Sequence, residues 1–285
     1  MTPRFDTAAI VGVGLLGGSL GLALKARRMA AHVHGIGRRQ ESLDTALELG
    51  AIDKTFLDIR EGIRGADLIV LCTPAALVAG QLDTIAASCE PNAVVTDVAS
   101  TKAEICAHAR ATWPHPLRFV GSHPMAGSEK YGPEHATERL YENCVTIVEC
   151  ADGHAPDAHE AVCALWKGAG ARVVEIEPSL HDALVARSSH IPHISSALVA
   201  ATAGELGDIH SVVGRGFRDV TRVAAGRPEI WRDICLTNRA AILEGLADLA
   251  KRLDAVRTMI DERDGATLDA FFTAAQRARK KALGE

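Results

Sequence analysis

The sequence predicts an α/β protein in which a doubly wound (Rossmann-like) parallel sheet is followed by an all-helical C-terminal domain. Short apolar runs alternate with helix-period segments over residues 1–178, as expected when helices connect parallel strands. A glycine-rich turn joins the first predicted strand to the first predicted helix. Residues 179–285 contain helical segments and no convincing strand, so we place the domain boundary near Pro178.

The predicted elements follow one another in steady alternation. The run at 66–72, ADLIVLC, is continuously apolar, which is typical of a strand buried on both faces of a parallel sheet. Strands are predicted at 8–11, 32–36, 66–72, 93–97, 118–120, 144–149 and 172–176, and helices at 15–24, 40–49, from about 75, at 101–112 and at 156–167.

Composition favours a soluble protein of the cytoplasm. The net charge of -5 gives no general attraction to nucleic acid or to an anionic membrane. The seven cysteines are odd in number and form no C-x-x-C pair, which suits a reducing compartment. We expect no signal peptide and no membrane helix, because glycines interrupt the first apolar run and no run reaches about 18 residues.

The glycine-rich turn has the spacing G-x-G-x-x-G, with Gly12, Gly14 and Gly17. The first glycine permits a tight turn, the second allows backbone to approach a pyrophosphate, and the third lets the helix pack close to the strand. The helix that opens at Leu15 and Leu16 then directs unpaired N–H groups at the phosphates. These residues, together with Thr73 at the end of another strand, are the predicted contacts of a dinucleotide.

The cofactor predicted from the second strand is NADP. An NAD site normally has an acidic residue about 20 positions after the glycines, but here Gly37 stands in that place, followed by Arg38 and Arg39. Guanidinium groups bind a 2′-phosphate through paired, charge-assisted hydrogen bonds. The alternative is that both arginines belong to a solvated loop, in which case NAD is the cofactor. Gly37→Asp should shift the preference toward NAD.

The segment 121–129, GSHPMAGSE, directly follows a predicted strand and contains the candidate base His123. Ligands of doubly wound folds bind at the carboxyl edge of the sheet, where this histidine is expected. An imidazole with a pKa near 6.5, roughly, accepts a proton at neutral pH. A structural histidine is the alternative for His123 when it is considered alone.

Several separated motifs resemble the prephenate/arogenate dehydrogenase family, enzymes of tyrosine biosynthesis. The matching segments keep the same order and comparable spacing, and they cover nearly the whole chain. They are VGVGLLGGSL near the N-terminus, DVASTK at 97–102, GSHPMAGSE at 121–129, HDALVARSSHIPH at 181–193, GFRDVTRVA at 216–224 and Trp-Arg-Asp at 231–233.

The resemblance implies an oxidative decarboxylation of a cyclohexadienol. His123 would accept the proton of the ring hydroxyl while the same carbon gives hydride to the nicotinamide, and carbon dioxide then leaves as the ring becomes aromatic. Ser100 matches a serine that contacts the hydroxyl, the nicotinamide and the histidine. From the sequence alone Ser100 is equally an N-cap for a helix starting at Thr101, and both roles are compatible.

The resemblance also implies a set of substrate contacts in the helical domain. Arg222 corresponds to the arginine that holds the ring carboxylate, although by itself it would be interpreted as a surface charge. Ser189 and His193 match residues that line the pocket for the substrate side chain. No metal is expected at His190 and His193, because Pro192 lies between them and no set of Asp, Glu or Cys ligands is nearby.

The resemblance also implies roles for two acidic residues and a subunit interface. Glu129 and Asp219 match residues that join an ionic network near the pocket mouth in relatives, with ordinary surface salt bridges as the alternative. Arg215 departs from the family pattern, and its role stays open. A homodimer is expected through the helical domain. The candidate seam is Ile242, Leu246, Leu249, Leu253, Val256 and Ile260. This pattern favours a core stripe over a seam used only by the dimer, and in a small helical domain both can hold.

Two other functions compete with this hypothesis. A β-hydroxyacid dehydrogenase would need a catalytic lysine in the helical region, and the sequence has none between Lys167 and Lys251. A non-catalytic NADP-binding sensor would keep the glycines but has no use for His123.

The sequence leaves open whether the small-molecule substrate is prephenate or arogenate, and whether tyrosine inhibits the enzyme.

Overall fold

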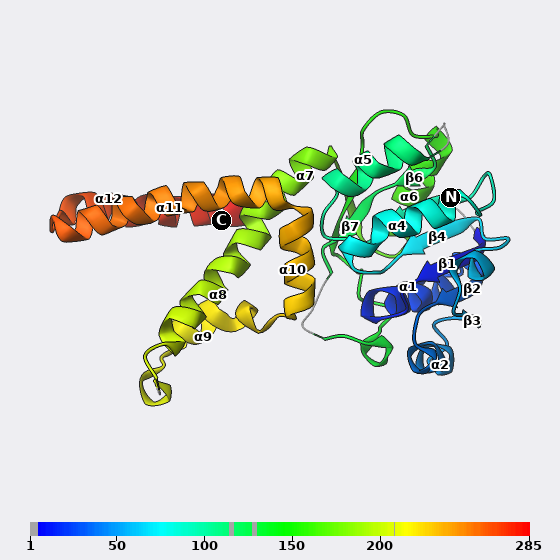
Figure 1. The fold of residues 1–285 in the computed structure, drawn as a ribbon, viewed down its shortest axis with the longest axis horizontal. Coiled ribbons are helices and arrows are strands. Elements are labelled where there is room, and N and C mark those ends of the chain that lie inside the picture. Colours follow the sequence, from blue (N-terminus) through cyan, green and yellow to red (C-terminus); the bar gives the residue numbers. More distant parts are fainter. Residues whose placement is uncertain (1–4, 114–116, 127–129, 208) are drawn as a thin grey trace. The chain divides into compact units, whose positions relative to one another are not determined.

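A six-stranded parallel sheet forms the centre of the N-terminal part of the protein. The computed structural model describes residues 5–113, 117–126, 130–207 and 209–285, and it forms two compact units, Met1–Arg239 and Ala240–Glu285. In the first unit the strand order is β3-β2-β1-β4-β5-β6, so the order reverses between β1 and β4 (Figure 1). The strands are β1 (Phe5–Val11), β2 (Ala30–Ile36), β3 (Lys54–Phe56), β4 (Leu68–Leu71), β5 (Val94–Asp97) and β6 (Phe119–Val120).

Helices cover both faces of this sheet, as the predicted fold class requires. Alternate residues of β1 enter different cores: Ala8 and Ile10 pack on one side, and Ala9 and Val11 on the other. Apolar residues of α1 and α6 belong to the first core, and those of α4 and α5 to the second. The helices between the strands are α1 (Leu15–Ala26), α2 (Gln40–Glu48), α3 (Ile59–Gly62), α4 (Ala75–Ala86) and α5 (Ala103–Thr112).

A second, three-stranded sheet follows the large one. Its order is β7-β8-β9, formed by β7 (Ser122–Pro124), β8 (Val145–Glu149) and β9 (Arg172–Ile176), and α6 (Pro156–Gly168) connects the last two. The predicted strands at 144–149 and 172–176 therefore exist, but they do not extend the parallel sheet. The reason is β7, which pairs antiparallel with β8, whereas β8 and β9 are parallel. This three-residue strand has no recognisable alternation in the sequence.

Helices make up the remainder of the first unit. No strand occurs after Ile176 in the described residues, as predicted. The chain passes from α7 (Pro178–Val185) through the π-helical turn η2 (Ala186–His190) directly into α8 (Ile191–Gly204). Pro192 explains the wide turn, because it lacks an N–H and its ring clashes with the carbonyl four residues earlier. Then come α9 (Arg215–Thr221) and α10 (Pro228–Thr237), with short 3-10 turns at Pro133–His135 (η1), His210–Val212 (η3) and Arg222–Ala225 (η4).

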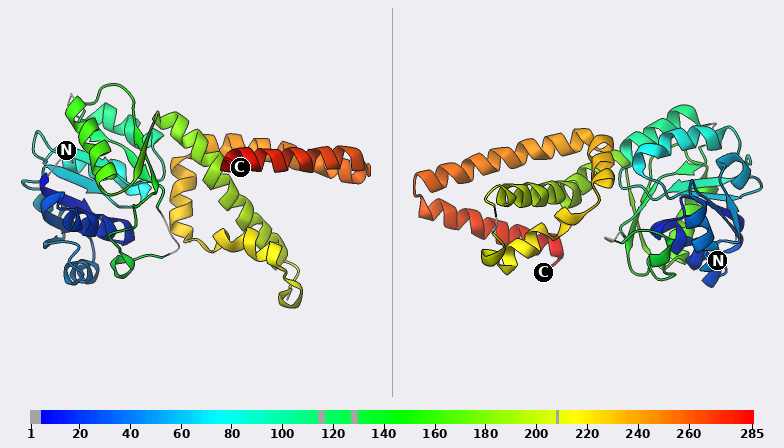
Figure 2. Two further views of the ribbon diagram at one scale, coloured as in Figure 1. Left: turned by 180° about the vertical axis from the view of Figure 1, so that it is seen from behind. Right: turned by 60° about the horizontal axis from the view of Figure 1, so that its bottom comes forward.

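The second unit is a helical hairpin made of α11 (Arg239–Asp261) and α12 (Gly265–Leu283), drawn in orange to red in Figure 2. Asp264 caps α12 by accepting a hydrogen bond from the backbone N–H of Thr267 at 3.0 Å. The predicted apolar stripe lies on α11. Leu253 and Ile260 are each 60% exposed, so the C-terminal half of the stripe is not core within one chain.

Two further sequence predictions concern the whole chain. All seven cysteines are free thiols. Among the described residues, no helix has both the length and the apolar character needed to cross a membrane. The domain boundary near Pro178 coincides with the first residue of α7, and it stays a prediction.

Candidate active site

The glycine turn lies at the carboxyl end of β1, and its shape depends on the absence of side chains. Gly12 has φ of +99°, and a Cβ there would lie 2.7 Å from the carbonyl oxygen of Cys72. A Cβ on Gly17 would lie 2.2 Å from the carbonyl oxygen of Gly12. Around Gly14, in contrast, no atom lies within 4 Å of where a Cβ would be. The turn is therefore closely packed at Gly12 and Gly17 and open at Gly14, as a binding site for a pyrophosphate must be.

The start of α1 leaves its electrostatic field available to a ligand. Gly14 is the N-cap, no side chain caps the helix, and its first turn contains no acidic residue. The backbone N–H groups at Leu15 and Leu16 therefore face no competing carboxylate. Thr73 borders the turn, since its Cγ2 would be 3.0 Å from a Cβ on Gly12, and its hydroxyl donates to Gln81 Oε1 at 2.5 Å. These residues fit a bound dinucleotide phosphate.

The end of β2 carries the residues predicted to read the cofactor's ribose. Gly37 follows the strand directly and donates its N–H to the carbonyl of Phe56 at 3.1 Å. Arg38 and Arg39 come next and are exposed, and Arg39 precedes the first turn of α2. Both guanidinium groups are thus accessible to a phosphate at this edge of the sheet.

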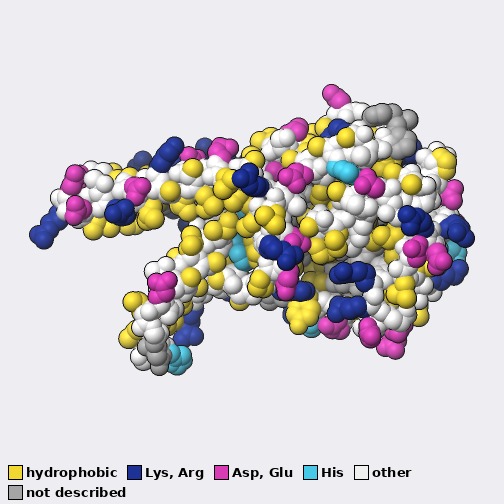
Figure 3. Space-filling model, viewed as in Figure 1, with side chains coloured by type: hydrophobic (Ala, Val, Ile, Leu, Met, Phe, Trp, Pro, Cys, Tyr) yellow, Lys and Arg dark blue, Asp and Glu magenta, His cyan; other side chains and the backbone are white. Residues whose placement is uncertain are grey.

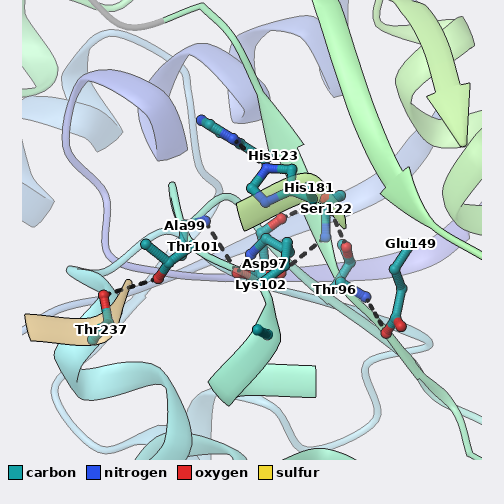
Figure 4. Close-up of polar contacts among 12 residues, drawn as sticks. Thr96, Asp97, Ala99, Thr101, Lys102, Ser122, His123, Glu149, His181 and Thr237 are labelled. Atoms are coloured by element: carbon teal, nitrogen blue, oxygen red, sulfur yellow. Dashed lines mark hydrogen bonds and ion pairs between the residues drawn. The ribbon is translucent and has the colours of Figure 1, made fainter. Parts of the chain in front are cut away.

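The predicted base, His123, lies in the middle of β7 and is buried. Its Nδ1 is 2.9 Å from Nε2 of His181, which is the fourth residue of α7 (Figure 4). On its other side, His181 places Nδ1 at 2.7 Å from Oδ1 of Asp182. Two imidazoles and a carboxylate thus form one buried chain of hydrogen bonds.

The direction of these hydrogen bonds follows from the carboxylate. Asp182 can only accept when ionised, so Nδ1 of His181 carries the proton and donates it to Asp182. Neutral His181 then has an unprotonated Nε2, which accepts a hydrogen bond from Nδ1–H of His123. This arrangement leaves the lone pair of His123 on Nε2. The chain therefore holds His123 in the tautomer that a general base needs.

The surroundings of His123 also keep it neutral. Burial lowers the pKa of His123 well below its usual value of 6.5, and positive charge on His181, Lys102 or His190 lowers it further. An imidazole with a depressed pKa remains unprotonated in mildly acidic solution. His123 is therefore available to accept a proton at neutral pH.

A buried polar network anchors the strand that carries His123. The carboxylate of Asp97, at the end of β5, pairs with the buried ammonium of Lys102 and accepts the backbone N–H of Ser122 at 2.9 Å. The hydroxyl of Ser122 is 2.9 Å from that of Thr96 and accepts from the indole N–H of Trp166 at 2.9 Å. Ser122 is thus held at three points, and His123 is its neighbour.

Ser100 lies in the turn after β5, next to this network. The alternative role as an N-cap is wrong: α5 begins at Ala103, and its N-cap residue Lys102 makes no side-chain cap. Asp182 takes that place, because its two carboxylate oxygens accept the backbone N–H groups of Lys102 and Ala103 at 2.8 and 2.9 Å. One aspartate therefore both orients His181 and joins α7 to α5.

Strand register relates the glycine turn to this chain of hydrogen bonds. Val11 in β1 pairs with Leu71 in β4, which pairs with Asp97 in β5. Adjacent strands lie about 4.8 Å apart, so the turns after β1 and β5 are separated by roughly 10 Å along one edge of the sheet. A nicotinamide extends about that far from its pyrophosphate. The fold thus brings Gly12, Ser100 and His123 to the same edge.

The π-helical turn positions another group of predicted residues. Ser189, partly buried, lies within this turn, and His193 follows in the first turn of α8. The ring of His193 stacks on Trp231 with centroids 3.3 Å apart and an interplanar angle of 16°. His190 is buried, and its Nδ1 accepts from the side-chain amide of Asn238 at 3.1 Å. Burial lowers the pKa of His190 to about 4.

The charged residues predicted at the pocket mouth are less closely connected. Arg222 begins η4, which packs against α8, and it is exposed. Asp219 pairs with Arg215 one helical turn earlier, at 3.6 Å, and both side chains are exposed. Glu129 lies outside the described residues. The structure therefore gives Arg215 a partner but joins neither Arg222 nor Asp219 to the hydrogen-bond chain of His123 through described residues.

Sequence reasoning missed the partners of His123. His181 and Asp182 belong to one of the family-like segments, and Lys102 belongs to another. The sequence alone does not indicate that these residues surround His123. An adjacent His-Asp pair in the first turn of a helix, after Glu177-Pro178, is the available signal. The contact between His181 and His123 spans 58 residues and depends on tertiary packing.

Comparison with known proteins adds an independent finding. Residues 20–175 match the family model described as "Prephenate dehydrogenase, nucleotide-binding domain", and residues 177–274 match "Prephenate dehydrogenase, dimerization domain". The chain is 34% identical to the prephenate dehydrogenase of Bacillus subtilis, over 97% of this chain and 76% of that protein. It is 31% identical to the cyclohexadienyl dehydrogenase of Zymomonas mobilis, over 96% of this chain and 95% of that one.

Solved structures agree with this similarity. The structure of prephenate dehydrogenase from Aquifex aeolicus with hydroxyphenyl propionate and NAD+ superposes with a TM-score of 0.92 at 26% identity, over 99% of this chain and 100% of that one. The arogenate dehydrogenase of Synechocystis has a TM-score of 0.82 at 29% identity, over 97% and 99% of the two chains.

Proposed function

The chain belongs to the prephenate dehydrogenase family, and from this premise we propose that it oxidatively decarboxylates prephenate, arogenate or both in tyrosine biosynthesis, with NADP as the preferred hydride acceptor. The observation that carries the proposal is the buried chain from His123 through His181 to Asp182, at the sheet edge that also carries the glycine turn. It supplies a neutral, oriented base where the nicotinamide would lie.

His123 acts as the general base of the reaction. Its Nε2 lone pair accepts the proton of the substrate's ring hydroxyl, because Nδ1 is occupied in donating to His181. A bound NADP would supply the acceptor for the hydride that leaves the carbon bearing this hydroxyl. As His123 gains a proton, the carboxylate of Asp182 stabilises the positive charge through His181. Removing the proton increases electron density on the ring carbon, which favours the loss of hydride and then of carbon dioxide.

Two further residues position the substrate in this proposal. Ser100, in the turn after β5, contacts the ring hydroxyl beside His123. The guanidinium of Arg222 binds the ring carboxylate, and its exposure leaves both N–H edges available for a paired hydrogen bond. Holding hydroxyl and carboxylate at two points fixes which carbon faces the cofactor.

The substrate side chain is assigned to the region of the π-helical turn. Ser189 supplies a hydroxyl there, and His193 presents an imidazole whose orientation is set by stacking on Trp231. The pKa of His193 is lowered by burial, so at neutral pH it is an uncharged hydrogen-bonding group. Such a group is compatible with a keto acid and with an amino acid, and so with both substrates.

The preference for NADP rests on the end of β2. Gly37 contributes no carboxylate that would repel a 2′-phosphate, and Arg38 and Arg39 are exposed beside it. An aspartate at position 37 can be accommodated, because its Cβ would lie 3.3 Å from a terminal methyl of Leu43, which can move. Gly37→Asp is accordingly the variant expected to favour NAD.

The two predicted domains have different roles in this proposal. Residues 1–178 bind the dinucleotide, and residues 179–285 bind substrate and form a homodimer. The limits of the two family models, 20–175 and 177–274, support this division. Figure 3 shows apolar side chains gathered along α11 and α12. Leu253, Ile260 and Phe272 of these helices are exposed, which suits a subunit interface. The seven free thiols support a cytoplasmic location.

A spectrophotometric assay that crosses both substrates with both cofactors tests the proposal. We expect reduction of the cofactor with at least one substrate, and a higher kcat/KM with NADP than with NAD. Equal use of the two cofactors would contradict the NADP assignment. If the protein binds the cofactor tightly but turns over neither substrate, the result would contradict the proposed dehydrogenase activity. It would favour a non-catalytic cofactor sensor.

A further inference from the structure

A cavity of about 350 Å³ lies against α6 and β9, and none of the predicted active-site residues lines it. Beside it, three side chains of types that bind metal ions lie close together. His159 and Cys163 occupy successive turns of α6, and Glu175 belongs to β9, with one ligand atom from each lying within 4.8 Å of the others. The cavity is lined by Cys150, Ala151, Asp152, Gly153, His154, Pro156, His159 and Glu175.

The orientation of His159 suits a metal ligand. Its Nε2 lies 3.0 Å from the carbonyl oxygen of Glu149, which can only accept, so Nε2 carries the proton. Nδ1 is then unprotonated, and it faces Sγ of Cys163 at 3.9 Å. The carboxylate of Glu175 lies 3.6 Å from Nε2, so it must turn to reach an ion bound at Nδ1. A zinc ion with bonds of about 2.3 Å to sulfur and 2.05 Å to nitrogen separates these two ligand atoms by roughly 3.6 Å. A backbone carbonyl that fixes the tautomer is the usual partner of a zinc-bound histidine.

A second observation points into the same cavity. His154 lines it with a side chain that is only 6% exposed, yet neither ring nitrogen has a hydrogen-bond partner among the described residues. Its Nε2 nevertheless interacts with the carboxylate of Glu149 at 3.5 Å and lowers the pKa of that carboxyl, so Nδ1 is the ring nitrogen left without a partner among the described residues. The ring centroids of His154 and His159 are 6.0 Å apart. A buried ring nitrogen without a partner requires one, and a cation in this cavity would supply it to Nδ1 of His154.

We propose that His159, Cys163 and Glu175 bind a zinc ion, and that His154, whose ring centroid lies 6.0 Å from that of His159, turns to become the fourth ligand. One thiolate, one carboxylate and two neutral imidazoles balance the two positive charges of the ion. This mixed nitrogen, sulfur and oxygen set favours a borderline transition metal such as zinc over calcium or magnesium, which prefer oxygen ligands alone.

The thiol of Cys163 is protonated when no metal is bound. Burial and the neighbouring Glu175 raise its pKa to about 11, although Lys167 acts in the opposite direction. Zinc displaces this proton, because the thiolate and not the thiol is the ligand.

The role of this zinc site is structural. Its ligands belong to α6, β9 and the segment before α6, which are the connections of the second sheet. Glu149, which holds His159 through its carbonyl, accepts the backbone N–H of Gly121 with its side chain at 3.1 Å. Gly121 is two residues from His123. The bound ion therefore stabilises the sheet that carries the catalytic strand without entering the reaction.

Zinc binding by the full-length protein, stripped with a chelator and titrated against a chromophoric competitor, tests this proposal. We expect one site per chain. Cys163→Ser and Glu175→Gln should each weaken binding by at least about ten-fold, a loss that even removal of an outer partner produces. His154→Gln should weaken binding as well. Cobalt should give a thiolate charge-transfer absorption that Cys163→Ser abolishes.

The matched controls separate a built site from general attraction. Asp152→Asn removes a charge from the same cavity, and Cys89→Ser removes a thiol elsewhere; both should bind zinc like the parent protein. Glu175 is half exposed, so Glu175→Gln should fold, and retained dehydrogenase activity checks this. Absence of stoichiometric zinc binding, unchanged affinity in Cys163→Ser and Glu175→Gln, or an equal loss in Asp152→Asn would overturn the proposal.

Discussion

At the residue scale, the chemistry of His123 depends on groups from separate stretches of the chain. Its tautomer follows from His181 and Asp182 in α7, and its strand is held by Asp97 at the end of β5. The sequence indicates His123 as the candidate base, because this histidine follows a strand in a family-like segment, and its catalytic role stays a prediction. It could not reveal the partners, because these contacts arise only when α7 packs against the sheet.

The pH dependence of catalysis should reflect this environment. The pKa of His123 is lowered chiefly by burial and also by His181, so the base stays deprotonated below pH 6.5. The acidic limb of kcat/KM should therefore lie below pH 6.5, with a plateau above it.

Replacing His181 tests its positioning role. His181→Phe removes the acceptor that fixes the tautomer of His123, so kcat should fall. It also removes a neighbour that lowers the pKa of His123, so the acidic limb should move to higher pH. His181→Gln retains an oxygen acceptor and should restore part of kcat. An unchanged pH profile in His181→Phe would show that His181 only packs against His123 and does not tune its pKa.

Stability should respond to pH through His190. Burial lowers its pKa from 6.5 to about 4, so the folded protein resists a protonation that the unfolded chain accepts. The unfolded state then binds more protons between these two values, and the free energy of unfolding should fall by up to about 3 kcal/mol as the pH drops from 6.5 to 4. Denaturant titrations of His190→Gln should show a flatter dependence, and an equally steep one would contradict this origin.

At the element scale, the long apolar elements and the two-residue strand β6 were predicted, whereas β3 and β7 were missed. The run at 66–72 contains β4, and the first glycine motif marks the junction of β1 and α1. The strands β3 and β7 have three residues each, which is too short for a period of two to be visible. The strand β7 matters most, because it carries His123 and turns the chain into the second sheet.

Two glycines of the turn should respond differently to an added methyl group. Gly12→Ala strains a residue at φ +99° and places Cβ 2.7 Å from a backbone oxygen, so it should lower the free energy of unfolding by about 2 kcal/mol and abolish cofactor binding. Gly14→Ala meets nothing within 4 Å, so stability should be unchanged. Its Cβ projects where the pyrophosphate lies and should weaken cofactor binding about ten-fold or more.

Thermal unfolding and fluorescence titration with NADP measure both effects. Gly80→Ala in α4 is the control, because it also has open space around the added Cβ but lies away from the turn. Cofactor affinity that is equal in Gly14→Ala and Gly80→Ala would contradict the assignment of the pyrophosphate to this turn.

At the scale of the whole molecule, the alternation of strands and helices predicted the sheet and its helical layers correctly. The heptad-like pattern in the second unit was ambiguous between a core stripe and a seam, because both bury one face of a helix. Leu253 and Ile260 are exposed within one chain, which excludes a core stripe of that chain at these positions and leaves the subunit seam as a prediction. Sequence periodicity cannot distinguish a partner helix of the same chain from one of another.

The proposed homodimer can be tested on this seam. Leu253→Glu places a charge on an apolar face of α11 and should shift the protein toward monomer in sedimentation experiments. Lys251→Glu introduces the same charge two residues away on an exposed position and should leave the dimer intact. A parent protein that sediments as a monomer, or equal dissociation of the two variants, would contradict the assignment of the interface.

The central claim is that the imidazole of His123 removes the hydroxyl proton of the substrate, and His123→Asn tests it most directly. Asparagine keeps a polar side chain in β7 but cannot accept this proton. Steady-state turnover should fall by about 10²–10⁴-fold, while the affinity for NADP stays within two-fold or so of the parent value. Turnover at the parental rate in a folded, NADP-binding His123→Asn protein would contradict the account.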